Sequence, residues 1–324
     1  MAVRDRVRIG SEPAGERGRG RRTKADDAGK AEKAEKAAVV GLVLAAVATV
    51  VWSGSFVTSR ALHDSVPPVQ AAFWRWIVAI VAVAPFAARE VWRQRAVLRR
   101  HMGFVALASL LGVTVYNTLV NQAGLSTSAG NMGMIMAASP VLMALYERLG
   151  GARLGVRRTA GTLVACAGVL LLVSKGSLAM DFAAGDLWML AAAVCFGSYS
   201  ALLRRKPAGI GGLAFLFSTF VLGALMLLPA YAVSLALQGG FEPTVGTVGP
   251  LVYVGVFSSA VAFFAWNKAI ALIGAARAGV IYYLQPVCVA LLSLALLGEA
   301  TGPAQIVCMA LILGGVMLGA GRGR

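Results

Sequence analysis

The architecture of this chain follows from two related stretches, AGNMGMIMAASPVLMAL (129–145) and AARAGVIYYLQPVCVAL (275–291). When Pro140 is set against Pro286, six of the last 13 aligned positions carry the same residue. Near the start of each half, Gly54-Ser55 matches Gly197-Ser198 at almost the same offset. The sequence therefore predicts an internal repeat that extends over most of the chain.

The composition indicates that a lipid bilayer surrounds the chain. Hydrophobic residues make up 58% of the 324 residues and charged residues 14%, with a mean hydropathy of +0.76. Soluble domains carry about 25% charged residues. Long apolar stretches recur after residue 36, each close to the roughly 20 residues with which a helix crosses a bilayer. We predict ten transmembrane helices, at 37–58, 69–87, 103–121, 126–147, 159–174, 186–203, 212–235, 247–269, 276–297 and 303–320.

Five helices in each half is an odd number, so the second half must enter the membrane from the opposite side. Many secondary transporters are built from such inverted repeats, with the substrate near the bilayer midplane where the halves meet. We therefore predict an all-α integral membrane protein with ten transmembrane helices, which form two inverted five-helix repeats around a central cavity. The expected parts are a disordered basic tail (1–36) and repeats at 37–175 and 185–320.

The basic residues predict the orientation. Eleven of the 30 Lys and Arg lie in residues 1–36. Fourteen more flank apolar segments on the same side, at 88–102, 148–158, 204–211 and the C-terminal end. Only Arg60 and Lys175 lie in the intervening connections. Because Lys and Arg favour the cytoplasmic side, we expect both termini in the cytoplasm, and we assign the net charge of +16 to membrane anchoring rather than to nucleic-acid binding.

Several short motifs carry a resemblance to a known family. They are WSGSF (52–56), FWRW (73–76), the stretch 117–140, AWNKAI (265–270), ARAG (276–279), Gln285-Pro286 and Gly298-Glu299. With them, residues 37–320 resemble the drug/metabolite transporter superfamily, in particular ten-helix proteins with two EamA-type repeats. The resemblance implies export or uptake of amino acids, other metabolites or drugs through a central cavity, without ATP. One departure is Arg153, which stands opposite Glu299 and argues against a symmetric pair of acids.

Arg75 is the one charge that lies clearly inside a predicted helix. A charged side chain in the hydrocarbon region costs about 2.5 kcal/mol or more, so it usually faces a cavity or a partner. One interpretation is a counter-charge for an anionic group of a substrate. The other is an anchor that reaches the outer interface beside Trp74 and Trp76. The sequence leaves both open.

Side-chain amides form a second group of candidates. Asn117 and Asn121 are four residues apart and share a helix face. Interhelical hydrogen bonds are the simpler explanation for both, and substrate contact is the alternative. Gln285 is a stronger candidate for the cavity, because Pro286 frees backbone carbonyls and bends its helix.

The remaining candidates are aromatic or basic. Trp52, Ser55 and Tyr199 lie at positions related by the repeat, and Tyr282 flanks Gln285. Trp266, Asn267 and Lys268 lie together in the AWNKAI motif, where Lys268 is either a positive-inside anchor or part of a pathway.

The prediction that follows is a secondary transporter in the cell membrane, an exporter of an amino acid or related metabolite by alternating access. The alternative is a membrane-embedded enzyme or lipid-handling protein that uses the same cavity. The sequence has no nucleotide-binding GxxxxGK[ST] loop, no HExxH motif and no cysteines at metal-ligand spacing. We therefore expect no catalytic residues, metal or cofactor, and as partners a small-molecule substrate and the bilayer. A homodimer is left open.

Overall fold

The structure is a computed structural model that describes residues 14–137, 139, 146, 156–173, 183–203, 205–282 and 284–320. All regular structure in these residues is helical, which confirms the all-α class. The first half contains α1 (Ala14–Ala61), α2 (Pro68–Arg100), α3 (Met102–Ser109), η1 (Leu110–Val115), α4 (Tyr116–Gly124), α5 (Ala129–Met136) and α7 (Val156–Val173). The second contains α8 (Ala184–Leu203), α9 (Gly212–Gln238), α10 (Val245–Tyr253), η2 (Val254–Val261), α11 (Ala262–Tyr282), α12 (Gln285–Leu297) and α13 (Pro303–Ala320).

Six of the described helical stretches are long and apolar enough to cross a membrane. They are 32–61, 68–100, 102–124, 184–203, 212–238 and 245–274. Shorter apolar helices lie at 159–172, 285–297 and 303–315. The predicted helix over 126–147 begins with α5, and Pro140 lies outside the described residues. A multi-span membrane protein is therefore supported, while the count of ten spans stays a prediction.

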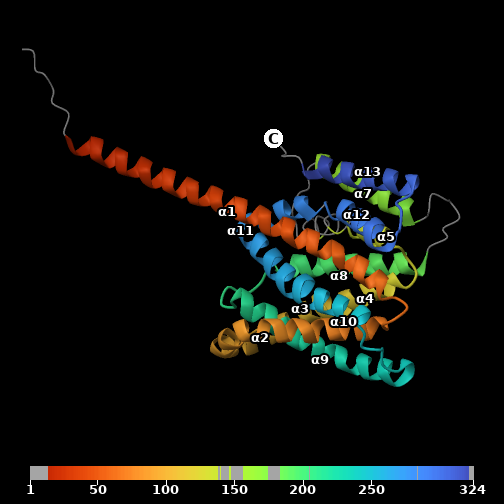
Figure 1. Cartoon of the computed structure of the whole chain (residues 1–324). Helices are drawn as coiled ribbons and strands as arrows, with labels where there is room; N and C mark the ends of the chain where they lie inside the picture. Colours follow the sequence, from red (N-terminus) through yellow and green to blue (C-terminus); the bar gives the residue numbers. More distant parts are fainter. Residues whose placement is uncertain are drawn as a thin grey trace, which may run out of the picture.

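Two helices are longer than the sequence predicts. α1 begins at Ala14, within the stretch that the sequence assigns to a disordered tail. Its Ala, Glu and Lys residues are good helix formers, and Lys36 pairs with Glu32 at 2.6 Å one turn away. α2 runs through the basic residues to Arg100 instead of ending near residue 87. Charged, helix-forming sequence therefore continues both helices past their apolar segments (Figure 1).

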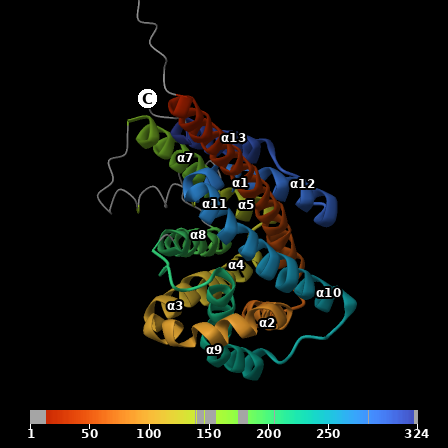
Figure 2. The same cartoon turned by 90° about the vertical axis from the view of Figure 1, so that its left-hand side faces the viewer.

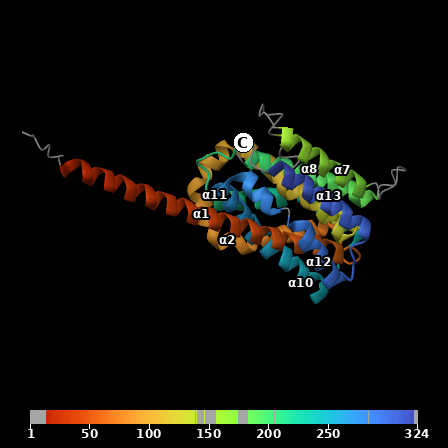
Figure 3. The same cartoon turned by 90° about the horizontal axis from the view of Figure 1, so that it is seen from above.

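The two halves pack reciprocally. α2 lies against α9 and α7 against α13, so each of these helices meets its counterpart in the other half, and α5 lies against α12. In the same way α1 packs against α11, and α4 packs against α8. Figure 2 and Figure 3 show α7 and α13 side by side, with α1 projecting beyond the other helices. This pairing is what a two-repeat architecture requires.

The third predicted helix of each half contains a π-helical segment, and the two segments occupy matching positions in the repeat. η1 and η2 begin 144 residues apart, close to the offset between the repeated motifs. Glycine in each segment permits a close approach: a Cβ on Gly112 would lie 2.6 Å from the Tyr199 ring, and one on Gly255 would lie 2.5 Å from Val78. The wide helical turns therefore lie at the contact between the halves.

The helices of the second half are broken near the candidate residues. Gly274 has φ +80°, a conformation that favours glycine, and it divides α11 into two helices. α12 then begins at Gln285, with Pro286 in its first turn, where proline costs no hydrogen bond. Gln285 therefore lies at a helix start, and the bend at Pro286 stays a prediction.

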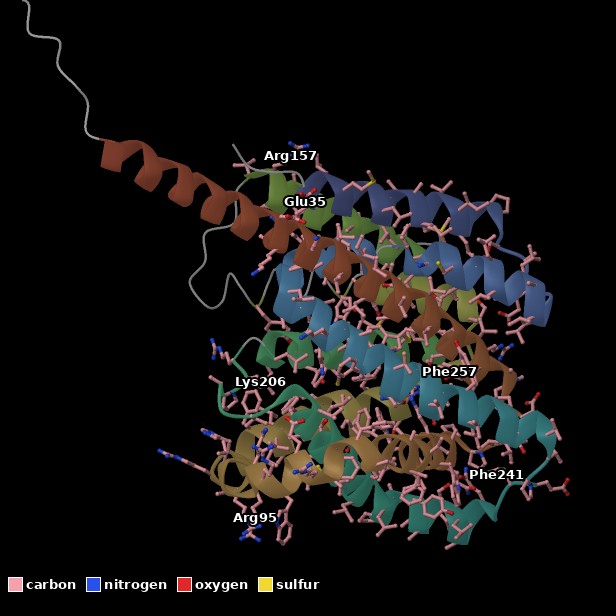
Figure 4. All side chains as sticks on the ribbon, turned by 60° about the vertical axis from the view of Figure 1, so that its left-hand side comes forward. Glu35, Arg95, Arg157, Lys206, Phe241 and Phe257 are labelled. Carbon is pink, nitrogen blue, oxygen red and sulfur yellow. The ribbon has the colours of Figure 1, made fainter. Side chains whose placement is uncertain are left out.

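Burial follows the pattern of a membrane protein. Arg75, Asn117 and Gln285 are buried, whereas large apolar side chains such as Val81 and Leu171 face outward. Two ends of the helix bundle can be distinguished. The basic end carries Arg95 of α2 and Lys206, and Phe241 lies at the opposite end (Figure 4). Phe241 packs against a cluster that contains Leu62, so the end of α1 with Arg60 and its partner Glu299 belongs to this opposite end.

Candidate functional site

Arg75 is buried between the two halves with only 4% of its surface exposed. Its three nitrogens donate to three serine hydroxyls: Nε to Ser259 at 2.6 Å, NH1 to Ser55 at 2.9 Å and NH2 to Ser258 at 2.9 Å. The guanidinium also lies 5.5 Å from the centre of the Trp76 ring, which is fully buried. The interpretation of Arg75 as an interface anchor is therefore wrong, and only Trp74 of its two aromatic neighbours is exposed.

The positive charge of Arg75 has no counter-charge in the described part of the chain. No described Asp or Glu forms an ion pair with it, and its partners are neutral hydroxyls. Each serine oxygen accepts from the guanidinium and keeps an O–H group that donates to no described acceptor. A buried cation surrounded by free hydroxyl donors is suited to an anionic group.

An aromatic cluster lies directly beside the arginine, centred on Trp52. The Trp52 ring lies 5.3 Å from Phe263, 5.4 Å from Trp266, 5.7 Å from Phe196 and 6.1 Å from Tyr282. Its Nε1 donates to the carbonyl of Ser258 at 2.8 Å, so one residue of η2 joins the aromatic cluster to Arg75. The cluster draws on both halves of the chain.

Polar atoms without partners border the cluster. Both side-chain atoms of Gln285, Trp266 Nε1 and Asn117 Oδ1 are buried and have no hydrogen-bond partner in the described residues. Buried polar groups are normally satisfied, and each unsatisfied one costs about 1–3 kcal/mol. Donors and acceptors left unpaired inside an aromatic enclosure indicate a place where a polar ligand belongs.

The other predicted site residues have different surroundings. Asn121 is fully partnered: its Oδ1 accepts from Ser59 at 2.7 Å and its Nδ2 donates to the Pro68 carbonyl at 3.3 Å. It therefore joins α1, α2 and α4, as the simpler interpretation predicts. Tyr199 is buried and its ring lies 6.2 Å from Phe263, at the edge of the aromatic cluster.

Asn267 and Lys268 line a pocket of about 500 Å³ near the basic end. Residues of α8, α9, α11 and the loop with Lys206 line this pocket. A second, much smaller cavity of about 10 Å³ lies beside Arg75 and is bordered by Thr58, Ser59 and Asn121. It has room for about one water molecule.

At the opposite end an ion pair joins the two halves. Arg60 Nε donates to Glu299 Oε1 at 2.9 Å, and the other carboxylate oxygen accepts from the Ala129 amide at 3.1 Å. Arg60 NH1 also donates to the Gly124 carbonyl at 3.0 Å. The sequence indicates no partner for Glu299, whose counterpart in the repeat is Arg153. In the structure its partner is Arg60, at the end of α1.

Sequence reasoning missed the residues that complete the site. Ser258 and Ser259 were not singled out, although two adjacent serines in an apolar helix are a detectable signal. Phe196 and Phe263 carry no such signal, because an isolated phenylalanine is ordinary in a membrane helix. Their place beside Trp52 depends on how α8 and α11 pack against α1.

The sequence of the chain matches a family of membrane proteins over both halves. The sequence model of the EamA-like transporter family matches residues 39–174 and 183–320, once for each half. A "probable terminal-alkyne amino-acid exporter" of Streptantibioticus cattleyicolor is 31% identical over 284 residues, which cover 87% of this chain and 92% of that protein. An uncharacterized transporter of Archaeoglobus fulgidus is 26% identical over 270 residues, 79% of this chain and 89% of that protein.

Similarity to other chains supports the same fold. The uncharacterized transporter YyaM of Bacillus subtilis is 24% identical over 259 residues, 78% of this chain and 85% of that protein. A solved crystal structure superposes with a TM-score of 0.61 at 22% identity and covers 88% of this chain and 96% of that one. At this identity the superposition speaks for the fold alone.

Proposed function

Because the chain belongs to the EamA-like transporter family, we propose that it is a secondary transporter that exports an amino acid or a related small metabolite. Transport would proceed by alternating access, in which the centre opens first to one side of the membrane and then to the other. The amino-acid class is supported by the relative named as a probable amino-acid exporter, with which the chain shares 31% identity.

One observation supports a substrate site at the centre of the molecule. Arg75 lacks a counter-charge, while Gln285 and Trp266 keep unpaired polar atoms in the adjacent aromatic cluster. An amino acid has complementary groups: its carboxylate suits the guanidinium and the serine hydroxyls, and its ammonium group suits amide oxygens and aromatic faces. Trp52 and Tyr282 would enclose the side chain of such a substrate.

The same proposal includes ten membrane spans with both termini in the cytoplasm. The six long apolar stretches and three shorter apolar helices supply nine spans. The segment that begins with α5 supplies the tenth. Twenty-five of the 30 Lys and Arg then lie on the cytoplasmic side, as the positive-inside rule requires.

In this orientation the described conformation faces the cytoplasm. The large pocket lies at the basic end, and the Arg60–Glu299 ion pair ties the halves together at the opposite end. The small cavity beside Arg75 would be the part of the pathway that widens when the outer end opens.

The test is counterflow in liposomes that contain the purified protein. Radiolabelled amino acids and organic acids are offered to wild type, Arg75→Ala and Arg75→Lys, with Arg95→Ala as the control. Arg95 stacks on Trp92 at 4.2 Å at the basic end. It lies 20 residues beyond Arg75 in α2, a separation of about 30 Å along the helix. We expect saturable counterflow that falls at least about tenfold in Arg75→Ala, a loss of about 1.4 kcal/mol of binding.

Two results would count against parts of this proposal. Saturable counterflow that is unchanged in Arg75→Ala would keep the transporter and remove Arg75 from substrate binding. A folded sample that exchanges no member of the panel would reject amino acids and organic acids as the substrate class. Partial recovery in Arg75→Lys would show that the charge matters in addition to the geometry of the guanidinium.

A further inference from the structure

The pocket near the basic end combines an apolar wall with a cationic rim. Its volume of about 500 Å³ lies within the range of small-molecule sites. Phe215 and Leu216 of α9 face Phe264 and Ile270 of α11 across the pocket lining. Among the described residues of the lining, Lys206 and Lys268 are charged and none is Asp or Glu. Such a pocket is complementary to a molecule with an apolar chain and a negative head.

The two ammonium groups have few partners within the protein. Lys268 is exposed and makes no hydrogen bond or ion pair with a described residue. Lys206 donates one hydrogen bond, to the carbonyl of Ile210. Burial lowers the pKa of Lys206, and the nearby Glu90 carboxylate opposes this effect only in part. An anion in the pocket would therefore find two incompletely paired cations.

A third polar group points to the kind of molecule that fits. Asn267 Oδ1 belongs to the pocket lining and is buried without a hydrogen-bond partner. An unpaired acceptor close to Lys268 suits a ligand that carries a donor next to its negative group. Gly212 leaves the wall open, since a Cβ there would meet no atom within 4 Å.

From these features we propose that the pocket binds an anionic amphiphile, with its negative head at Lys206 and Lys268 and its apolar chain between α9 and α11. The inference rests on the proposed function, in which this pocket is the cytoplasmic entrance to the pathway. A substrate carboxylate and the headgroup of an anionic inner-leaflet lipid share this chemistry, and the experiment separates the two sources.

The experiment measures binding of radiolabelled hexanoate to the full-length protein in phosphatidylcholine nanodiscs. Unlabelled norleucine and hexylamine serve as competitors. Hexylamine has the same chain length and the opposite charge, and norleucine adds an ammonium group for Asn267. We expect norleucine to compete at least as well as unlabelled hexanoate, and hexylamine to compete at least about tenfold more weakly.

Variants then assign the binding to this pocket. Lys268→Gln and Lys206→Gln should each weaken hexanoate binding several-fold, and Gly212→Leu should block it by filling the space beside α9 without a change in charge. Arg277→Gln is the matched control, because Arg277 is an exposed cation of α11 that lies beyond the break at Gly274 and is not among the described residues of the pocket lining. Elution as a single species in size-exclusion chromatography confirms that each variant is folded.

Nanodiscs that also contain phosphatidylglycerol separate the two sources. Unchanged hexanoate binding assigns the pocket to a soluble substrate, and displacement by this lipid assigns it to a headgroup. Equal competition by hexylamine, or binding that is indifferent to both lysines, overturns the proposal. Counterflow by the wild type is measured separately. If transport is intact while hexanoate binding does not depend on the lysines, the proposal for this pocket fails and the proposed transport function stands.

Discussion

At the scale of single residues, several buried polar groups at the centre of the molecule have no hydrogen-bond partner among the described residues. Arg75 satisfies its nitrogens with three hydroxyls, while Gln285, at the start of α12, leaves both of its side-chain atoms unpaired. A protein that keeps such groups buried gives up stability that an apolar side chain would provide. The loss is reasonable if a ligand completes the hydrogen bonds during transport.

Replacement of Gln285 by methionine tests this idea. Methionine has a similar volume and no polar group, so the unpaired amide disappears without a cavity. We expect the free energy of unfolding in detergent to rise by about 1 kcal/mol in the absence of substrate, while counterflow is lost. Thermal unfolding of the purified variant measures the first effect. A lower unfolding temperature than wild type would instead mean that Gln285 has a structural partner, such as Tyr282.

The same residues show how far the sequence leads. The sequence singles out Arg75 and Gln285 because a charge or an amide in an apolar helix is costly unless it has a partner. Pro286 marks the helix break. The free hydroxyls around Arg75 and the phenylalanines around Trp52 are not singled out, because serine and phenylalanine are ordinary in such helices. The sequence favours interhelical hydrogen bonds for Asn121 and leaves the role of Arg75 open, and their hydrogen-bond partners in space differ.

At the scale of helices, the two π-helical segments set how closely the halves approach. η2 brings Ser258 and Ser259 to the same guanidinium, although adjacent residues of an α-helix point in directions about 100° apart. π-helical turns are rare and frequently occur at functional sites. Hydropathy reveals the third helix of each half but not its internal geometry, which is why the segments escape prediction from the sequence.

Gly255 offers a test at this scale. A methyl group there would lie 2.5 Å from Val78 and 3.0 Å from the Arg75 carbonyl. We expect Gly255→Ala to push η2 away from α2 and to destabilise the protein by about 1–3 kcal/mol, the usual cost of overpacking. Gly249→Ala is the matched control, because a Cβ at Gly249 of α10 meets no atom within 4 Å.

The stabilities of the two variants should therefore differ. Gly249→Ala should leave stability unchanged or raise it by about 0.5–1 kcal/mol, because alanine favours the helix. Thermal unfolding of both variants in one detergent gives the comparison. Equal stability of the two variants would show that α2 and η2 can separate at no cost.

At the scale of the whole molecule, an ion pair joins the two halves at the end opposite the basic end. Arg60 at the end of α1 reaches Glu299 in the turn between α12 and α13, and both also bind backbone near α5. Both side chains are about one quarter exposed, so the pair itself contributes modestly to stability. Its effect should appear in access to the centre rather than in unfolding.

Labelling of a cysteine at position 58 measures that access. Thr58 borders the small cavity beside Arg75, and the four native cysteines are replaced in the background. We expect Arg60→Ala and Glu299→Ala each to raise the rate of labelling by a thiol reagent several-fold from outside. The double variant should add little, because either change alone removes the shared interaction. Additive effects, or none, would mean that other contacts close this end.

The matching positions of η1 and η2 also bear on the history of the chain. A π-helical turn arises when one residue is added to an α-helix, and two independent additions at corresponding places would be a coincidence. If the second half arose by duplication of the first, the wide turn is older than that duplication. An ancestor of five helices would then have carried it, and two copies of that ancestor, inserted in opposite senses, would have met along the same surfaces that join the halves today.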